Sequence, residues 1–264
     1  MDDASIKEAR TRMRQVQEHL LLAGKAHGAR EENVGMVDVI FHPANPLGDL
    51  NYVTPRRNTA WVSAGYVEQG LSRLQALGRT PRVRYLEGLF PPAFGQTLLK
   101  LGLAHESRTA LLAATVERLS EVPAVHPDTD TGNRRSLREG GTAWDVTALD
   151  DNGVGFAVAA FRDGALHVSL QVETQPQTGA ARIVGFVPRQ RADSVDLRRA
   201  LLDAACRTAA QQGCPLLFVL VSDEDAPAYR ELGFDDLGAL VSYAAPADEG
   251  QAHERVAQSL SSSR

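Results

Sequence analysis

Cysteine is nearly absent from this 264-residue sequence, which holds only Cys206 and Cys214. Two cysteines exclude a disulfide framework and a multi-cysteine zinc site. Aromatic residues are few, at 6%, and the net charge is −5, which together disfavour a nucleic-acid partner. The longest apolar run, 215–221, is too short to span a bilayer, and the first residues carry no signal-peptide core. We therefore expect a soluble, cytoplasmic protein with no membrane partner.

The rest of the composition, 43% hydrophobic and 23% charged, is that of a globular chain. Hydrophobic periodicity and turn residues predict an alternation of helices and strands. Helices are expected over 4–23, 62–77, 93–101, 195–212 and 227–232, and strands over 34–41, 50–53, 82–87, 154–162, 165–173, 180–187, 215–221 and 237–244. Residues 143–149 fit one further strand, and 108–116 fit a strand or a helix. The pattern predicts an α/β fold with mixed, mostly antiparallel sheets flanked by helices.

Two halves of the sequence share one layout. In each, a strand ending near a proline, Pro55 or Pro188, is followed by a helix closed by a glycine 23 or 25 residues later, then a strand and a short helix. The proline-, glycine- and charge-rich interval 121–141 reads as a linker or long loop. We therefore expect modules at 1–120 and 142–246 and a flexible tail at 247–264.

The most specific segment is Ala228–Phe234, a tyrosine on a short helix followed by Leu-Gly-Phe, just after the apolar strand 216–222. This arrangement resembles the GNAT superfamily, the acetyl-CoA-dependent N-acetyltransferases, over residues 153–245. The first half, 34–115, resembles the degenerate N-terminal module of tandem GNAT proteins, because Leu98 stands where the tyrosine would be. The acceptor-side helices of a complete GNAT domain are missing from the second half, so the first half or a partner chain, as in a homodimer, would supply them.

The resemblance implies that the pyrophosphate of acetyl-CoA lies at the start of helix 195–212, where unpaired N–H groups and the helix dipole favour an anion. Arg191 fits the family pattern of Arg or Gln, two residues, Gly, one residue, and Gly or Ala. Ser194 and Asp196 replace its small residues, and the Asp196 carboxylate would oppose the pyrophosphate by roughly 1–4 kcal/mol. The implied cofactor-binding residues are Phe186, Val187, Arg189, Arg191, Ala192, Ser194, Val195 and Asp196.

The same segment has an ordinary structural explanation. Asp193, Ser194 and Asp196 favour the start of any helix, because acids and hydroxyls stabilise its positive end. A helix that carries its own acids needs no phosphate there.

The resemblance implies that Tyr229 protonates the leaving CoA thiolate, although a core tyrosine would look the same in sequence. Glu173, near the end of a predicted strand, is the candidate general base, and its alternative is a solvated strand-end carboxylate. His167 on the same strand is a further candidate, with an exposed or hydrogen-bonded histidine as its alternative. Scattered histidines predict no metal site.

Two charged segments have two interpretations each. The acidic loop Ser222–Asp225 could receive a cationic amine or cap the following helix. Arg134, Arg135 and Arg138 could contact an anion or form a solvated loop.

Two functions therefore stay open. The first is an acyl-CoA-dependent N-acyltransferase that delivers an acetyl group to an amine of a small molecule or protein. The second is a non-catalytic binding or scaffold protein, a pseudoenzyme that keeps the fold and has lost CoA binding.

Overall fold

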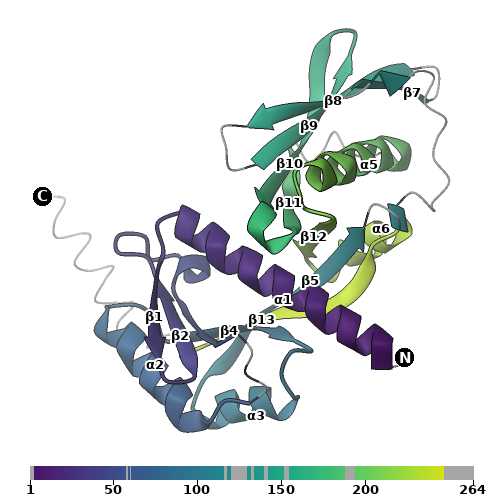
Figure 1. Cartoon of the computed structure of the whole chain (residues 1–264). Coiled ribbons are helices and arrows are strands. Elements are labelled where there is room, and N and C mark those ends of the chain that lie inside the picture. The colour runs from purple at the N-terminus through teal and green to yellow at the C-terminus, as the bar shows by residue number, and fades with distance from the viewer. Residues whose placement is uncertain are drawn as a thin grey trace, which may run out of the picture. The chain divides into compact units, whose positions relative to one another are not determined.

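A computed structural model describes residues 3–57, 59, 61–115, 118–119, 130–131, 134–139, 142–151, 155–187 and 194–246 (Figure 1). The helices are α1 (Asp3–Ala26), α2 (Ala64–Ala76), α3 (Ala93–Lys100), α5 (Val195–Gln211) and α6 (Ala226–Glu231), with short 3-10 turns η1 (Gly48–Leu50) and η2 (Pro176–Thr178). The strands are β1 (Arg30–Val34), β2 (Val37–Phe41), β3 (Tyr52–Pro55), β4 (Arg82–Glu87), β5 (Ala104–Thr115), β6 (Asp130–Thr131), β7 (Arg134–Glu139), β8 (Thr142–Asp151), β9 (Gly155–Arg162), β10 (Ala165–Gln175), β11 (Ala180–Val187), β12 (Leu216–Val221) and β13 (Asp235–Ala244). Among these residues, no helix is long and apolar enough to cross a membrane.

The chain forms two compact units, which we call the first and second unit. The first contains Met1–His27, Leu86–Leu89 and Arg108–Leu240, and the second contains Gly28–Tyr85, Phe90–Ser107 and the segment from Val241. Neither unit is a continuous stretch of sequence. The division of the chain at 121–141 into two modules stays a prediction.

The sheet of the first unit runs in the order β13-β5-β12-β11-β10-β9-β8-β7-β6. Strands β7 to β11 pair antiparallel in sequence, as short hairpin connections allow, and Asp163-Gly164 forms the predicted turn between β9 and β10. Strand β12 pairs parallel with β11 and antiparallel with β5. Helix α5, the connection between β11 and β12, supplies the crossover that a parallel pair requires.

Alternating side chains assign α1 and α5 to opposite faces of this sheet. One face packs with α5, whose Leu197, Leu201 and Ala205 are fully buried. Its strand residues are Ala110, Leu112, Ala114, Val168, Leu170, Val172, Ala181, Ile183, Leu217 and Val219. The intervening residues point the other way, where His19 of α1 contacts Ala180 and Phe218. Figure 1 shows α5 lying along β8, β9 and β10.

Helix α1 therefore supplies a helix to the face that the second half of the sequence leaves uncovered. It packs on β10, β11 and η2, all from the second half. The buried positions of α1 include Met13, Val16 and His19, a spacing that places them along one stripe. Ile6, which the periodicity assigns to this stripe, is 42% exposed.

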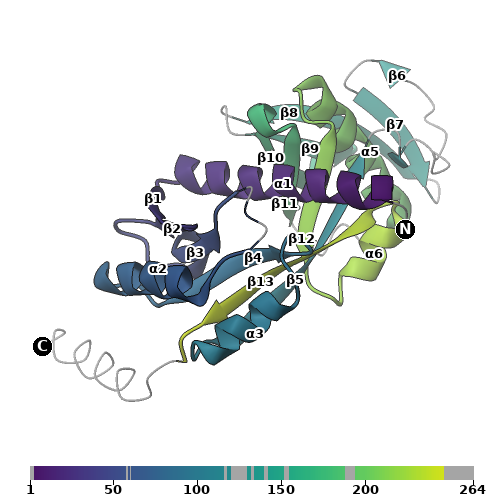
Figure 2. The same ribbon diagram turned by 60° about the horizontal axis from the view of Figure 1, so that its bottom comes forward.

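The sheet of the second unit runs in the order β1-β2-β3-β4-β13. Strands β1, β2 and β3 form an antiparallel meander, and β3 pairs parallel with β4 at Val53 and Val83. Helix α2 packs against β1, β2 and β3 (Figure 2). This unit thus repeats the parallel pair and crossover helix of the first unit, and the predicted α/β class of mixed sheets flanked by helices is confirmed.

Each unit receives a strand from the other half of the sequence. In the first unit, β12 pairs with β5, which follows the short helix of the first half. In the second unit, β4 has β13 as its neighbour, which follows the short helix of the second half. The equivalent strands of the two halves are therefore exchanged.

The short helices α3 and α6 end identically, which fixes the correspondence between the halves. Leu103 N–H donates to Leu98 O at 3.2 Å, and Phe234 N–H donates to Tyr229 O at 3.1 Å. The glycine between, Gly102 or Gly233, has a φ of 80° or 95°, as this helix-ending motif requires. Leu98 therefore occupies the position of Tyr229, as the alignment of the two halves predicts.

Three segments differ from the sequence expectations. The single strand expected over 34–41 is a hairpin, because the chain reverses at Gly35-Met36 and pairs Val34 with Val37. Residues 108–115, part of the segment that fits a strand or a helix, belong to strand β5. The interval 121–141 is not entirely loop, because β7 pairs along its whole length with β8. Polar composition hid this strand, which lies near the edge of the sheet, between β8 and the short strand β6.

Candidate functional site

The parallel strands β11 and β12 pair over only part of their length. Their register runs from Ala180 opposite Leu216 to Ile183 opposite Val219 and ends there, although β11 continues to Val187. On its other side, β11 pairs with β10 throughout, but with a bulge. Gln171 lies opposite Gly185 and Val172 opposite Ile183, which leaves Val184 as the extra residue. The two strands thus lose contact in the half of β11 that leads to the start of α5.

Apolar side chains are exposed around this divergence. Val184 is 61% exposed, Val187 54% and Val195, the first residue of α5, 52%. Phe186 is half-buried against the core on the α5 side, and the Arg198 guanidinium lies 6.0 Å from its ring centre. Exposed apolar residues in a cluster mark a surface that a ligand or partner can cover.

The start of α5 is stabilised by its own side chains. Ser194 caps the helix, and its Oγ accepts a hydrogen bond from Leu197 N–H at 3.2 Å. Asp196 lies in the first turn, where its charge complements the helix dipole. The predicted ligands Arg189, Arg191 and Ala192 lie outside the described residues.

Helix α2, the equivalent of α5 in the second unit, begins differently. Ser63 at its start makes no side-chain capping bond, and the first turn contains no acid. Ser63-Ala64-Gly65 supplies the small residues that Ser194-Val195-Asp196 lacks, and a Cβ at Gly65 would meet nothing within 4 Å. These small residues are visible in the sequence, but the predicted cofactor-binding residues all lie at 186–196.

Tyr229 lies on α6, half-buried against the core that α5 covers. Its ring meets Phe234 edge to face at a centroid distance of 5.6 Å. Arg199 of α5 donates to the carbonyl of Glu231 at 3.5 Å and so links α5 to the end of α6. The predicted acid is therefore positioned by both its own helix end and α5.

Glu173 lies on the opposite face of the sheet, beneath α1. It is buried, and its carboxylate lies 3.7 Å from His19 Nε2 and 3.4 Å from His27 Nε2. The His19 ring beside it holds the pKa of the Glu173 carboxyl below its usual value, and outweighs the burial that raises it. Glu173 and Tyr229 are thus not brought together on one face, and the solvated strand-end alternative for Glu173 is wrong.

Sequence reasoning missed the two histidines. His19 continues the buried stripe of Met13 and Val16, a position where a polar residue signals a buried partner. His167 is the other catalytic candidate on β10. The centre of its ring lies 4.7 Å from the ring centre of Trp144.

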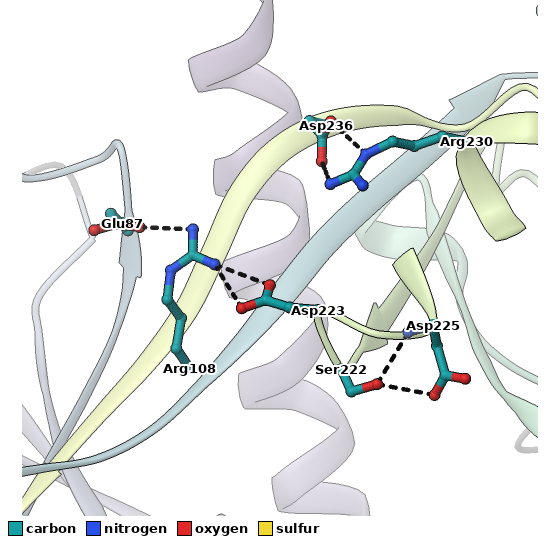
Figure 3. Close-up of polar contacts among 7 residues, drawn as sticks. All are labelled: Glu87, Arg108, Ser222, Asp223, Asp225, Arg230 and Asp236. Atoms are coloured by element: carbon teal, nitrogen blue, oxygen red, sulfur yellow. Dashed lines mark hydrogen bonds and ion pairs between the residues drawn. The ribbon is translucent and has the colours of Figure 1, made fainter. Parts of the chain in front are cut away.

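The acidic loop after β12 is tied to its surroundings (Figure 3). Arg108 of β5 donates to Asp223 at 3.1 Å and to Glu87 at 3.3 Å, so its guanidinium joins two carboxylates. Ser222 Oγ accepts from Asp225 N–H at 3.1 Å and donates to the Asp225 carboxylate at 3.0 Å. Ser222 thus closes the turn that leads into α6, whereas Asp225 at the start of this helix makes no side-chain capping bond.

A second pair lies beside this loop, at the junction of α6 and β13. Arg230 holds Asp236 with two hydrogen bonds of 2.8 and 2.9 Å (Figure 3). These bonds are the largest cause that lowers the pKa of the Asp236 carboxyl. Asp223 and Asp236 are thus each paired with an arginine, so neither carboxylate requires a bound amine to balance its charge.

The described part of the chain contains no assembled site for metal or thiol chemistry. No three histidine, cysteine or acidic side chains gather there as ligands. Both cysteines are buried thiols outside any disulfide, and burial raises the pKa of Cys214.

Comparisons with known proteins identify the fold. No protein-family model matches the sequence, and a search of curated proteins finds no match. A GCN5-related N-acetyltransferase from Kribbella flavida is 16% identical with a TM-score of 0.59, over 86% of this chain and 93% of that one. A tandem GNAT protein from the clavulanic acid biosynthesis pathway is 12% identical with a TM-score of 0.53, over 94% and 97%. The chain therefore has the fold of the GNAT superfamily, a fold of acyl-CoA N-acyltransferases.

Proposed function

We propose that this protein is an acyl-CoA-dependent N-acyltransferase that transfers an acetyl group from acetyl-CoA to an amine. The observation that carries the proposal is the divergence of β11 and β12 after Ile183 and Val219, next to a bulge and leading to the start of α5. Separated parallel strands offer unpaired backbone groups and an apolar gap, which suits the extended, amide-containing arm of acetyl-CoA. The fold likeness supports the same activity.

The residues around the divergence fit such an arm. Phe186, Val187 and Val195 provide exposed or half-exposed apolar surface, and β11 beyond Ile183 keeps its β12-facing backbone groups free of β12. Ser194 would meet the pyrophosphate, together with Arg189, Arg191 and Ala192, which precede it in the sequence. Acetyl-CoA would supply the activated thioester.

In this proposal Tyr229 holds the proton that the leaving sulfur receives, because α6 begins five residues after β12 ends. An amine acceptor must lose a proton before it attacks, and Glu173, the base proposed from the sequence, lies on the sheet face opposite Tyr229, beneath α1. Its lowered pKa and its two histidine neighbours make it a weak base near neutral pH. The acceptor is a small-molecule or protein amine, and we infer a cytoplasmic location, with a homodimer as one open arrangement.

A non-catalytic scaffold is the second candidate, and α5 is the observation that favours it. Ser194 already satisfies Leu197 N–H, and Asp196 already provides the negative charge that the helix dipole attracts. A pyrophosphate at this position would compete with both.

Titration calorimetry with acetyl-CoA separates these two functions. Binding of acetyl-CoA to the unaltered full chain at micromolar affinity supports the enzyme, and a panel of amines with thiol release as readout then follows. Absence of heat with the unaltered chain, together with binding by the Asp196→Gly variant, supports the scaffold. Absence of binding by both refutes a CoA site at α5.

A further inference from the structure

His19 is an unusual residue for the centre of a buried stripe. Its side chain is fully buried on α1, and its ring meets Phe218 of β12 edge to face at 5.0 Å. Nδ1 lies 3.1 Å from the carbonyl oxygen of Ala180 on β11. Within the described residues, Nε2 has no hydrogen-bond partner. A buried polar atom without a partner calls for an explanation.

The carbonyl of Ala180 determines which nitrogen carries a proton. A carbonyl oxygen only accepts, so Nδ1 must donate. A neutral ring would then present the lone pair of Nε2 to Glu173 Oε2, 3.7 Å away. A lone pair facing a carboxylate is repulsive, whereas an N–H there is attractive and charge-assisted. The position therefore suits an imidazolium whenever Glu173 is ionised.

The charges around Glu173 keep that carboxyl ionised. Besides His19, the positive groups that lower its pKa are Arg182 on the neighbouring strand β11 and His27 just beyond the end of α1. His27 Nε2 lies 3.4 Å from Glu173 Oε1, and its side chain is 62% exposed. Phe218 of β12 is uncharged, and η2 contributes no titratable group. One carboxylate of β10 thus faces two histidines of the α1 segment.

We propose that His19, Glu173 and His27 form a proton-controlled clasp that holds α1 on the β10–β12 face of the first unit. The clasp is closed when His19 carries two ring protons and Glu173 carries none. Loss of the proton from His19 places a lone pair against the carboxylate in a buried position and weakens the attachment of α1. Because α1 covers the sheet face opposite α5, opening of the clasp exposes that face.

The sign of the pH dependence follows from the two groups. The favourable contribution of His19 requires its second ring proton, so it is present at acidic pH and is lost when that proton leaves at higher pH. The contribution of Glu173 is lost in the opposite direction, as the pH falls through the carboxyl range. The clasp therefore holds best in weakly acidic solution and loosens toward alkaline pH.

Hydrogen exchange of the full chain tests the clasp without any ligand. Protection of α1 amides, relative to those of α5 and corrected for intrinsic exchange, should fall as the pH rises from weakly acidic to alkaline, by at most about tenfold per pH unit, the limiting slope of a one-proton linkage. Glu173→Gln should remove this slope, because an uncharged partner tolerates the neutral ring. Glu8→Gln is the matched control, since Glu8 pairs with Arg12 on exposed α1 surface, and should keep the slope.

Nitrogen NMR of the histidine rings in the unaltered chain provides a second measurement that does not depend on a folded variant. At pH 6, both ring nitrogens of the buried histidine should bear protons. An unprotonated Nε2 at that pH, a relative α1 protection that does not change with pH, or an unchanged slope in Glu173→Gln would each overturn the proposal.

Discussion

Replacing Asp196 by Asn changes two properties of the first unit in opposite directions. Asp196 is the second residue of α5 and is half-buried, and Leu197 N–H beside it is already bonded to Ser194. A unit negative charge about 4 Å from one phosphate charge costs about 1 kcal/mol in water and about 4 kcal/mol near a protein surface. At about 1.4 kcal/mol per tenfold, the Asp196→Asn variant should bind acetyl-CoA about fivefold to several hundredfold more tightly.

The same change removes a favourable helix-dipole interaction of about 0.3–1 kcal/mol. At about 2–4 °C per kcal/mol for a chain of this size, the melting temperature should fall by about 1–4 °C. Tighter binding by a less stable protein is the signature of a charge that opposes the ligand, because a general improvement in folding would raise both.

Titration calorimetry with acetyl-CoA and thermal melts without ligand measure the two effects. Asp203→Asn is the matched control: it removes the same charge from the same helix, but Asp203 lies two turns further on and pairs with Arg207. Its affinity should stay within about twofold. Equal affinity of the Asp196→Asn variant and the unaltered chain, with both binding, would refute the electrostatic reasoning. Added salt should reduce the difference in acetyl-CoA affinity between the Asp196→Asn variant and the unaltered chain, because salt screens charges that water reaches.

Three further predictions concern the site and the packing. Tyr229→Phe should keep the melting temperature within a few degrees and lower the rate of thiol release about 10²–10⁴-fold, because it removes only the proposed acid; an unchanged rate argues against that role. Gly70→Ala on α2 should lower the free energy of unfolding by about 1–3 kcal/mol, since its Cβ would lie 2.9 Å from two valine side chains. A Cβ at Gly65 on the same helix meets nothing within 4 Å, so Gly65→Ala should raise the free energy of unfolding by about 0.4–1 kcal/mol. Denaturant melts in which Gly65→Ala is less stable than Gly70→Ala contradict this reasoning. Arg82→Gln should be most destabilising near neutral pH, because Arg82 lowers the pKa of Glu106, and the difference in melting temperature between the variant and the unaltered chain should shrink in acid as Glu106 protonates; a difference that grows toward acid would contradict it.

Local patterns in the sequence predicted the elements whose causes are local. The Asp163-Gly164 turn specified the β9–β10 hairpin, and the apolar run 215–221 specified a strand buried on both faces. The glycine after α3 and after α6 placed the ends of both short helices within a residue. These signals act between residues close in sequence, so no knowledge of tertiary contacts was needed.

Tertiary contacts decided what the sequence left open or missed. Strand β7 reads as a polar loop and is held by its pairing with β8. The sequence around Glu173 suggests a solvated strand end. Nothing near it in sequence reveals His19, which precedes it by 154 positions and whose Nε2 lies 3.7 Å from its carboxylate. The helix covering the second-half sheet could not be assigned either, since it comes from the start of the chain.

The exchanged strands set a schedule for synthesis of the chain. Thr115 pairs with Leu216, so β5 leaves the ribosome roughly a hundred residues before its partner, a delay of about 5–20 s at ordinary elongation rates. During that interval its apolar segment, with Leu111, Leu112 and Ala113 all destined for full burial, has no strand to bind. Strand β4 likewise precedes β13 by nearly the whole second half. The nascent chain therefore presents open β-edges until its final strand emerges, and open edges are sites where other chains can pair.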